Sequence, residues 1–250
     1  MSRQRAIVLP LAILTFAALV IIGSALTGAA NSIDNIHWIG NPLPPCFVDA
    51  KLCGGHVLGS DEVGRDMLIR LIVGARTTLI VSLCALVCAG LIARALAQLT
   101  RRVRFAQWVV SRIADAISSI SPWPYVAIIS SISTGKREPL LGGLWLALWA
   151  GLLCWPALWR LMLESCSPKP LLKKFARYWS MLILVFFTVD FFGYGIQPPL
   201  ASLGNMLSNV QANMQIAWWA AVLPALCAFL LVLTIEIAAR FGGAPLDEAS

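Results

Sequence analysis

Long apolar runs alternate with shorter polar segments along this chain. Each run is about 20 residues long, which is the length that a helix needs to cross the hydrocarbon core of a bilayer. The runs fall at 6–29, 77–99, 107–133, 141–163, 178–196 and 216–239. The pattern therefore predicts an all-α, polytopic membrane protein with six transmembrane helices.

Composition supports a membrane protein. Apolar residues make up 59% of the 250 residues, and charged residues only 12%. A soluble domain carries about 25% charged residues and could not bury so much apolar surface. The composition therefore excludes an ordinary soluble domain.

The basic residues indicate an orientation. If both termini lie in the cytoplasm, most of the 19 lysines and arginines fall on that side, as the positive-inside rule expects. The net charge of +7 is therefore interpreted as a topology signal and not as a nucleic-acid-binding surface. The predicted parts are a cytoplasmic N-terminus with the first transmembrane helix (1–29), an external segment (30–76), a five-helix core (77–240) and a cytoplasmic tail (241–250).

The first apolar run has an alternative interpretation as a signal peptide, because basic residues precede it and small residues follow it. The run from Ala6 to Leu26 is longer than the apolar core of about 7–15 residues that signal peptides have. We therefore expect a retained first span in a multi-pass protein of the cell inner membrane.

The densest charged stretch is HVLGSDEVGRDMLIRLIVGARTTL, residues 56–79, directly before the second run. Its pattern predicts an amphipathic helix over 60–76 that lies at the outer membrane interface, capped by Ser60 or Asp61. The spacing predicts two ion pairs, Glu62 with Arg65 and Asp66 with Arg70. The simpler alternative is a solvated helix end that only anchors the second span.

Two long motifs carry a family resemblance. The string GSDEVGRDMLIRLIVGART resembles the G-T-D-x-x-G-R-D-x-x-S-R-L-x-x-G-x-R-x-S segment of permeases in the dipeptide/oligopeptide (and nickel) class of ABC importers. Its matching residues are Gly59, Asp61, Gly64, Arg65, Asp66, Arg70, Leu71, Gly74 and Arg76. The string FFGYGIQPPLASLGNML, residues 191–207, is similar to the family's F-L-G-L-G-x-Q-P-P-x-x-x-W-G-x-M-L segment. Its matching residues are Gly193, Gly195, Gln197, Pro198, Pro199, Gly204, Met206 and Leu207.

The resemblance runs from about residue 6 to 240 and is closest to the second permease of the pair. It implies a permease subunit that forms half of a translocation pathway for peptides or similar small solutes. The partners that it implies are a second permease subunit, two cytoplasmic ATPase subunits and an external substrate-binding protein. It also implies that the first motif belongs to the outer gate region.

The sequence departs from the family in the cytoplasmic loop that contacts the ATPase. The family carries an E-A-A-x-x-x-G segment there, whereas this chain reads ESCSPKPLLKKFARYW over a shorter loop, residues 164–179. Pro168 and Pro170 are expected to prevent a regular helix at their own positions, which leaves a short helix over 171–177. The candidate ATPase-facing residues are Lys169, Lys173, Lys174 and Phe175.

Three interpretations of this loop stay open. It is a basic anchor at the cytoplasmic surface, a reduced coupling element, or a remnant in a chain that has lost coupling. In the last case the protein would be a permease-derived scaffold or regulatory subunit of the membrane.

No motif indicates an enzyme or a cofactor. The sequence lacks G-x-x-x-x-G-K-[ST], H-E-x-x-H and C-x-x-C, so any ATP hydrolysis belongs to separate subunits. Cys46 and Cys53, in CFVDAKLC, fall outside and can form a disulfide or stay free. A metal site that adds His37 and His56 to them lacks the usual ligand spacing, so no metal is predicted.

Three acidic residues fall at or near membrane depth, where an ionisable group needs a partner or a polar path. Asp115 can pair with Arg112, and Glu236 with Arg240. Asp190 has no local partner and is the candidate for lining a polar pathway. In the second run, Ala85, Ala89 and Ala93 recur every four residues, which predicts close approach of another helix.

Overall fold

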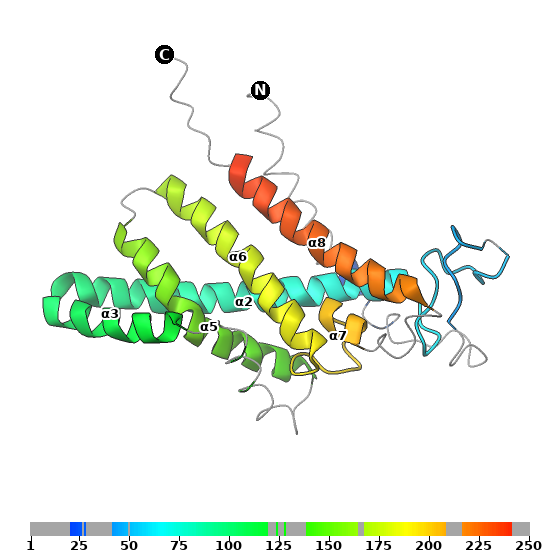
Figure 1. Ribbon diagram of the computed structural model, residues 1–250, viewed down its shortest axis with the longest axis horizontal. Coiled ribbons are helices and arrows are strands. Elements are labelled where there is room, and N and C mark those ends of the chain that lie inside the picture. The colour runs from blue at the N-terminus through cyan, green and yellow to red at the C-terminus, as the bar shows by residue number, and fades with distance from the viewer. Residues whose placement is uncertain are drawn as a thin grey trace, which may run out of the picture.

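The described part of the chain is built from helices alone, without a strand. In this computed structural model the description covers residues 21–26, 28, 42–49, 51–119, 124, 128, 139–164, 168–208 and 217–241. The named helices are α2 (Met67–Arg102), α3 (Arg104–Ser118), α5 (Pro139–Glu164), α6 (Pro168–Phe191), α7 (Leu203–Ser208) and α8 (Trp218–Phe241). The long α2 runs the length of the molecule, α5, α6 and α8 cross it obliquely, and α3 folds back beside its far half (Figure 1). The predicted all-α class is confirmed.

Helix α2 is the structural axis, and its two ends follow from its sequence. Asp66 caps its start, because the carboxylate accepts the backbone N–H of Ile69 at 3.0 Å. Arg101 and Arg102 occupy the last turn, where positive charge suits the helix dipole, and Val103 turns extended. With 36 residues the helix is about 54 Å long, which exceeds a hydrocarbon core of about 30 Å.

Three of the described helices contain segments that are long and apolar enough to cross a membrane. By length and composition these segments are Met67–Arg102, Trp145–Leu163 and Trp218–Arg240. They match the second, fourth and sixth predicted runs. In the range of the third run the structure describes α3, which ends at Ser118, so the predicted run is not one unbroken helix; most of 120–133 lies outside the described residues. The first run lies mostly outside the described residues, of which 21–25 are helical.

Helix α6 contains the fifth run only up to Phe191. The chain then turns, because Gly193 adopts a φ of +78° that residues with a side chain rarely reach. The N–H groups of Gly193 and Tyr194 donate hydrogen bonds to the carbonyl oxygens of Asp190 and Val189, respectively, which caps the C-terminal end of the helix. The predicted span at 178–196 is thus a helix followed by a tight turn.

The main core lies between α2 and α5, where small residues let the two backbones approach. Ala85, Ala89 and Ala93 on α2 are fully buried, as their four-residue spacing predicted. Gly151 on α5 faces them so closely that a Cβ there would lie 2.6 Å from the Cβ of Cys88 and 3.0 Å from the carbonyl oxygen of Ala85. The helices therefore depend on glycine at this position.

We expect Gly151→Ala to destabilise the protein by about 1–3 kcal/mol, because the α2 backbone cannot yield to the added methyl group. Gly90→Ala is the matched control, since its added Cβ would meet only the edge of the Phe175 ring, at 3.4 Å. Alanine favours helix at both sites, so a loss at Gly151 alone reports the crossing. Thermal unfolding of both variants in mild detergent checks this, and equal melting temperatures would contradict it.

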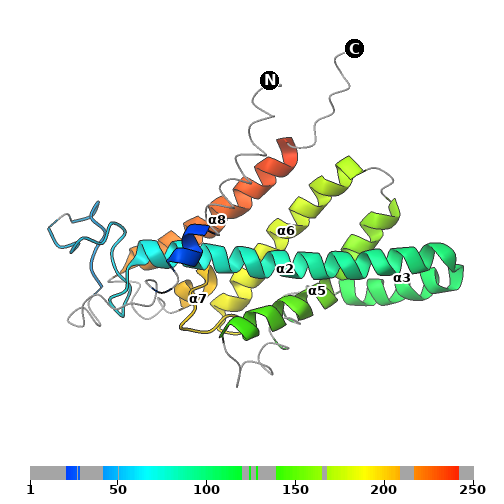
Figure 2. The ribbon, with the colours of Figure 1, turned by 180° about the vertical axis from the view of Figure 1, so that it is seen from behind.

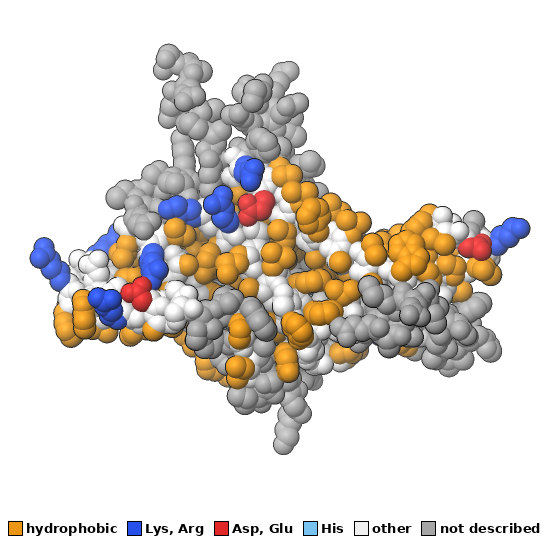
Figure 3. All heavy atoms as spheres, in the orientation of Figure 1, with side chains coloured by type: hydrophobic (Ala, Val, Ile, Leu, Met, Phe, Trp, Pro, Cys, Tyr) orange, Lys and Arg blue, Asp and Glu red, His pale blue; other side chains and the backbone are white. Residues whose placement is uncertain are grey.

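The helices meet toward two different ends of the molecule, as both ribbon views show (Figures 1 and 2). The motif end holds the start of α2, the end of α6, α7 and the start of α8. The basic end holds the α2–α3 junction, the end of α5 with the start of α6, and the end of α8. Lysine and arginine side chains gather toward the basic end, while apolar side chains cover the middle (Figure 3). A concentration of positive charge at one end is typical of membrane-spanning helix bundles.

Candidate functional site

The two sequence motifs, far apart in the chain, meet at the motif end. Gly74 on α2 faces the start of α7, where an added Cβ would lie 3.3 Å from the backbone N of Leu203 and from the sulfur of Met206. The hydroxyl of Thr78 lies 3.4 Å from the N–H of Leu203. Residues of both motifs share one apolar cluster with the first turns of α8. The motifs therefore form one packed unit, which we call the motif unit.

Asp61 organises the loop of the first motif. One carboxylate oxygen accepts the backbone N–H groups of Val63 and Arg65 at 3.0 and 2.9 Å. The other lies 2.8 Å from Nε of Arg65 and 3.4 Å from Nε of Arg70. Gly64, with a φ of +82°, allows the tight turn between them. A single carboxylate thus ties the loop to the buried first turn of α2.

This arrangement corrects the sequence prediction for the stretch 60–76. Residues 59–66 form a loop, closed by an isolated bridge between Ser60 and Asp66, and the helix begins only at Met67. The cap is Asp66, and neither Ser60 nor Asp61. The predicted separate interfacial helix is wrong, because 67–76 continue without a break into α2, and so the boundary at 76/77 falls inside a helix.

The predicted ion pairs are also wrong. Arg65 and Arg70 both approach Asp61, and the other oxygen of Asp66 lies 2.7 Å from Nδ1 of His56. The local rule for helices failed because Glu62, Arg65 and Asp66 precede the helix, where separation in sequence does not set side-chain distance. Arg70 is only 2% exposed, so its charge is held inside the protein.

Three further contacts fix the loop in place. Two hydrogen bonds join Ser60 and Leu43. The N–H of Ser60 donates to the carbonyl oxygen of Leu43 at 3.1 Å, and the N–H of Leu43 donates to the hydroxyl oxygen of Ser60 at 2.8 Å. The indole of Trp219 donates to the carbonyl oxygen of Ser60 at 3.4 Å. At Gly59, with a φ of +77°, a Cβ would lie 2.5 Å from the carbonyl oxygen of Leu43. The motif loop is thereby clamped between the external segment and α8.

The remaining arginine of the first motif lies on α2. Arg76 packs against residue 23, where a Cβ on Gly23 would lie 2.9 Å from the Arg76 side chain. The described turn of the first apolar run therefore contacts the motif unit.

Asp190 plays the corresponding part in the second motif. Its side chain is 1% exposed and accepts the N–H of Ile196 at 2.8 Å. Local side-chain spacing offered Asp190 no partner, and the structure satisfies its carboxylate with a backbone N–H six residues later. In this structure Asp190 braces the turn after α6, and its predicted role in a polar pathway remains a prediction.

The glycines of the second motif make room around Asp190. An added Cβ at Gly195 would collide with the Asp190 carboxylate. At Gly204 it would collide with the carbonyl oxygen of Phe187 and lie 2.5 Å from Cβ of Asp190. These two glycines therefore allow the turn and α7 to fold onto the end of α6.

Side-chain amides complete the second motif. The amide nitrogen of Asn205 donates to the carbonyl oxygens of Ile196 and Leu200 at 3.1 and 2.8 Å. That of Gln197 donates to the carbonyl oxygen of Gly193 at 2.7 Å. Pro198 and Pro199, which follow, are exposed. Asn205 was not predicted, although the S-x-x-N spacing after Ser202 is a helix-capping signal that could have found it.

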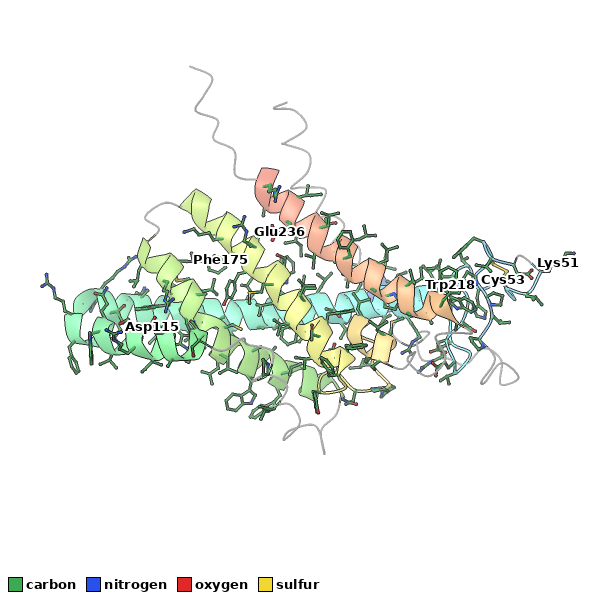
Figure 4. All side chains as sticks on the ribbon, viewed as in Figure 1. Lys51, Cys53, Asp115, Phe175, Trp218 and Glu236 are labelled. Atoms are coloured by element: carbon green, nitrogen blue, oxygen red, sulfur yellow. A yellow bond between two sulfur atoms is a disulfide. The ribbon has the colours of Figure 1, made fainter. Side chains whose placement is uncertain are left out.

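The external segment next to the motif unit carries a disulfide between Cys46 and Cys53. Figure 4 places Cys53 and Lys51 at the motif end, near Trp218. The two cysteine sulfurs are bonded to each other, and the His56 ring contacts the carboxylate of Asp66, so each of these candidate ligands already has a partner. No metal-binding group was found among the residues that the structure describes.

The other two acidic residues have partners on neighbouring helices. Asp115 on α3 forms an ion pair with Arg160 of α5, and its distance to Arg112 is 3.9 Å. Glu236 on α8 accepts a hydrogen bond of 2.6 Å from the hydroxyl of Ser180 on α6. The predicted ion pair of Asp115 with Arg112 is confirmed, but its N–O distance is longer than that of the pair with Arg160. The carboxylate of Glu236 faces α6. Both partners lie too far away in sequence for local spacing to reveal them.

The segment expected to face an ATPase is largely helix. Only residues 165–167 separate α5 from α6, so Pro168 and Pro170 lie in the first turn of α6. The expectation that they prevent a helix is wrong, because first-turn N–H groups need no intrahelical acceptor. Lys169 and Lys173 fall in the first turns of α6, and Lys174 is half-buried.

Phe175 does not face outward as predicted. Its ring packs on α2, 3.4 Å from where a Cβ of Gly90 would lie. It joins the core between α2 and α5, on the side toward the basic end (Figure 4). Phe175 is therefore a packing residue of the bundle in this structure.

The chain was compared with known proteins. No family model matches it. The di/tripeptide transport system permease protein DppC of Pseudomonas aeruginosa is 28% identical over 224 residues, which cover 78% of this chain and 72% of that protein. The dipeptide transport system permease protein DppC of Escherichia coli is 29% identical, covering 80% and 79%. A probable peptide ABC transporter permease protein of Sinorhizobium fredii is 28% identical, covering 72% and 70%.

These similarities extend over most of the chain and include the region between its two long motifs. They agree with a structure in which both motifs serve one folded unit. The chain is thus a relative of the permeases of peptide-class ABC transporters, which confirms the resemblance that the two motifs indicated.

Proposed function

We propose that this chain is a transmembrane permease subunit of an ABC importer and forms half of a pathway for peptides or similar small solutes. The observation that carries the proposal is the motif unit, in which two motifs typical of such permeases pack together through Gly74 and α7. Its relatives are peptide transport permeases. No enzymatic role is proposed for the chain.

In the proposed topology the chain crosses the cell inner membrane six times, and both termini lie in the cytoplasm. The motif end then faces outward and the basic end inward. The gathering of lysine and arginine at the basic end supports this orientation. The disulfide between Cys46 and Cys53 at the opposite end also supports it, because disulfides persist outside the cytoplasm. The proposed parts remain 1–29, 30–76, 77–240 and 241–250.

In this proposal the chain pairs with a second permease, and two ATPase subunits bind at the basic end. An external substrate-binding protein delivers the solute at the motif end. The motif unit would hold the outer ends of α2, α6 and α8 in register. Because this unit would be rigid, helix movement at the basic end would be transmitted to the outer side and open it.

A second candidate function is a permease-derived scaffold or regulatory subunit. It is favoured by the short connection between α5 and α6, which leaves only residues 165–167 for a coupling element. In this alternative the partner permease alone would couple to the ATPases.

A pull-down of the tagged chain from native membranes in mild detergent, followed by mass spectrometry, tests the proposal. We expect it to recover a second permease together with ATPase subunits, because a working importer needs both. Recovery of the permease without ATPases, across several detergents and nucleotide conditions, would favour the scaffold. Recovery of neither would overturn both functions.

A further inference from the structure

The α2–α3 junction carries a surface that the transport proposal does not use. Two helices meet there at Val103, and three arginines surround it, at Arg101, Arg102 and Arg104. All of these residues are exposed. Arg101 donates to the carbonyl oxygen of Met162 at 2.7 Å, which fixes the junction against the end of α5.

Aromatic side chains lie beside these arginines on the first two turns of α3. Phe105 and Trp108 are 73% and 59% exposed, and their rings stack with centroids 6.3 Å apart. The other side of α3 buries Val110 and Ala114 against the bundle. The outward side of α3 therefore offers two large aromatic rings next to a positive charge.

The depth of this surface is set by α2. Its apolar run ends at residue 99, about one helical turn, or about 6 Å, before the junction at Val103. Trp108 lies one helical turn back from the junction, about 6 Å nearer the bilayer. That position corresponds to the headgroup layer, where tryptophan is enriched and arginine side chains reach phosphate.

We propose that Arg102, Arg104 and Trp108 form a binding surface for anionic phospholipid headgroups. Arg102 and Arg104 form no ion pair with any described residue, so their charges are available to phosphate. Trp108 and Phe105 insert their rings among the upper parts of the acyl chains. The two features together match a charged, amphipathic lipid and are typical of helices that lie at a membrane surface.

Native mass spectrometry of the delipidated full chain tests this proposal, with titrations of phosphatidylglycerol and of phosphatidylcholine that carries the same acyl chains. We expect tighter binding of phosphatidylglycerol, and roughly a tenfold loss of that binding in the double variant Arg102→Gln/Arg104→Gln. The control is Arg177→Gln/Arg240→Gln, which removes the same charge from exposed positions on α6 and α8. Trp108→Ala should weaken the binding of both lipids. Melting temperatures of all variants establish that they are folded.

Three outcomes would overturn the proposal. The first is an equal loss in the control, which would mean that net charge alone attracts the lipid. The second is competition by millimolar inorganic phosphate, which would mean that the surface recognises phosphate and not a lipid. The third is an unchanged lipid preference with loss of ATPase recovery in the pull-down, which would make the junction a protein-docking surface. The titration needs no partner subunit, so its result is independent of the proposed transport function.

Discussion

Asp61→Asn is expected to destabilise the protein by about 3 kcal/mol and to reduce transport. The substitution leaves the shape of residue 61 unchanged but removes the negative charge that lies 3.4 Å from the buried Arg70. Removing one partner of a buried ion pair leaves a charge without compensation and typically costs about 3–5 kcal/mol. Asp61 is 14% exposed, and so water replaces little of the lost interaction.

Loss of the carboxylate should also loosen the loop of the first motif. Asp61 accepts the N–H groups of Val63 and Arg65, and an amide oxygen is a weaker acceptor than a carboxylate oxygen. The loop holds Ser60, whose carbonyl oxygen receives the indole of Trp219, so a change at Asp61 should reach α8. We therefore expect uptake to fall even at temperatures where the protein stays folded.

Asp49→Asn is the matched control for Asp61→Asn. Asp49 lies in the same external segment and loses the same charge, but its carboxylate accepts only exposed backbone N–H groups of Lys51 and Leu52. Thermal unfolding in detergent and solute uptake by cells that carry each variant provide the two measurements. If the melting temperatures of the two variants agree within error, Asp61 does not organise the loop.

The helices could be predicted from the sequence because lipid imposes a simple requirement. A spanning segment must be apolar for about 20 residues and must satisfy its own backbone hydrogen bonds, so composition and length identify it. The runs at 77–99, 141–163 and 216–239 satisfy both conditions, and the structure has apolar helical segments there, at Met67–Arg102, Trp145–Leu163 and Trp218–Arg240. The run at 107–133 satisfies the first condition only on average, and the helix within it ends at Ser118.

The contacts of the site could be predicted only in part. The motifs identified Asp61 and Gly204, but their partners depend on the path of the backbone. Gly59 and Gly64 adopt positive φ, which turns the loop so that Asp61 reaches Arg70 nine residues later. Contacts between helices, such as Arg160 with Asp115, follow from packing and leave no local signal.

Gly204→Ala is expected to prevent α7 from seating on α6, at a cost of about 3 kcal/mol or more. The added methyl group would collide with the carbonyl oxygen of Phe187 and lie 2.9 Å from the N of Phe191, and neither backbone atom can move without bending α6. It would also lie 2.5 Å from Cβ of Asp190. Because Asp190 braces the turn at Ile196, the whole second motif should be displaced.

Gly143→Ala provides the comparison for Gly204→Ala. Gly143 is a buried helical glycine in α5, but an added Cβ there would meet Val81 and Ile196 at 3.4 Å or more, which is ordinary contact. Helix propensity favours alanine over glycine, by about 1 kcal/mol in a helix interior, so it cannot account for a loss of stability at Gly204. Thermal unfolding of the two variants in the same detergent measures that difference. If Gly204→Ala melts at or above the temperature of Gly143→Ala, the second motif does not depend on close packing of α7 against Asp190.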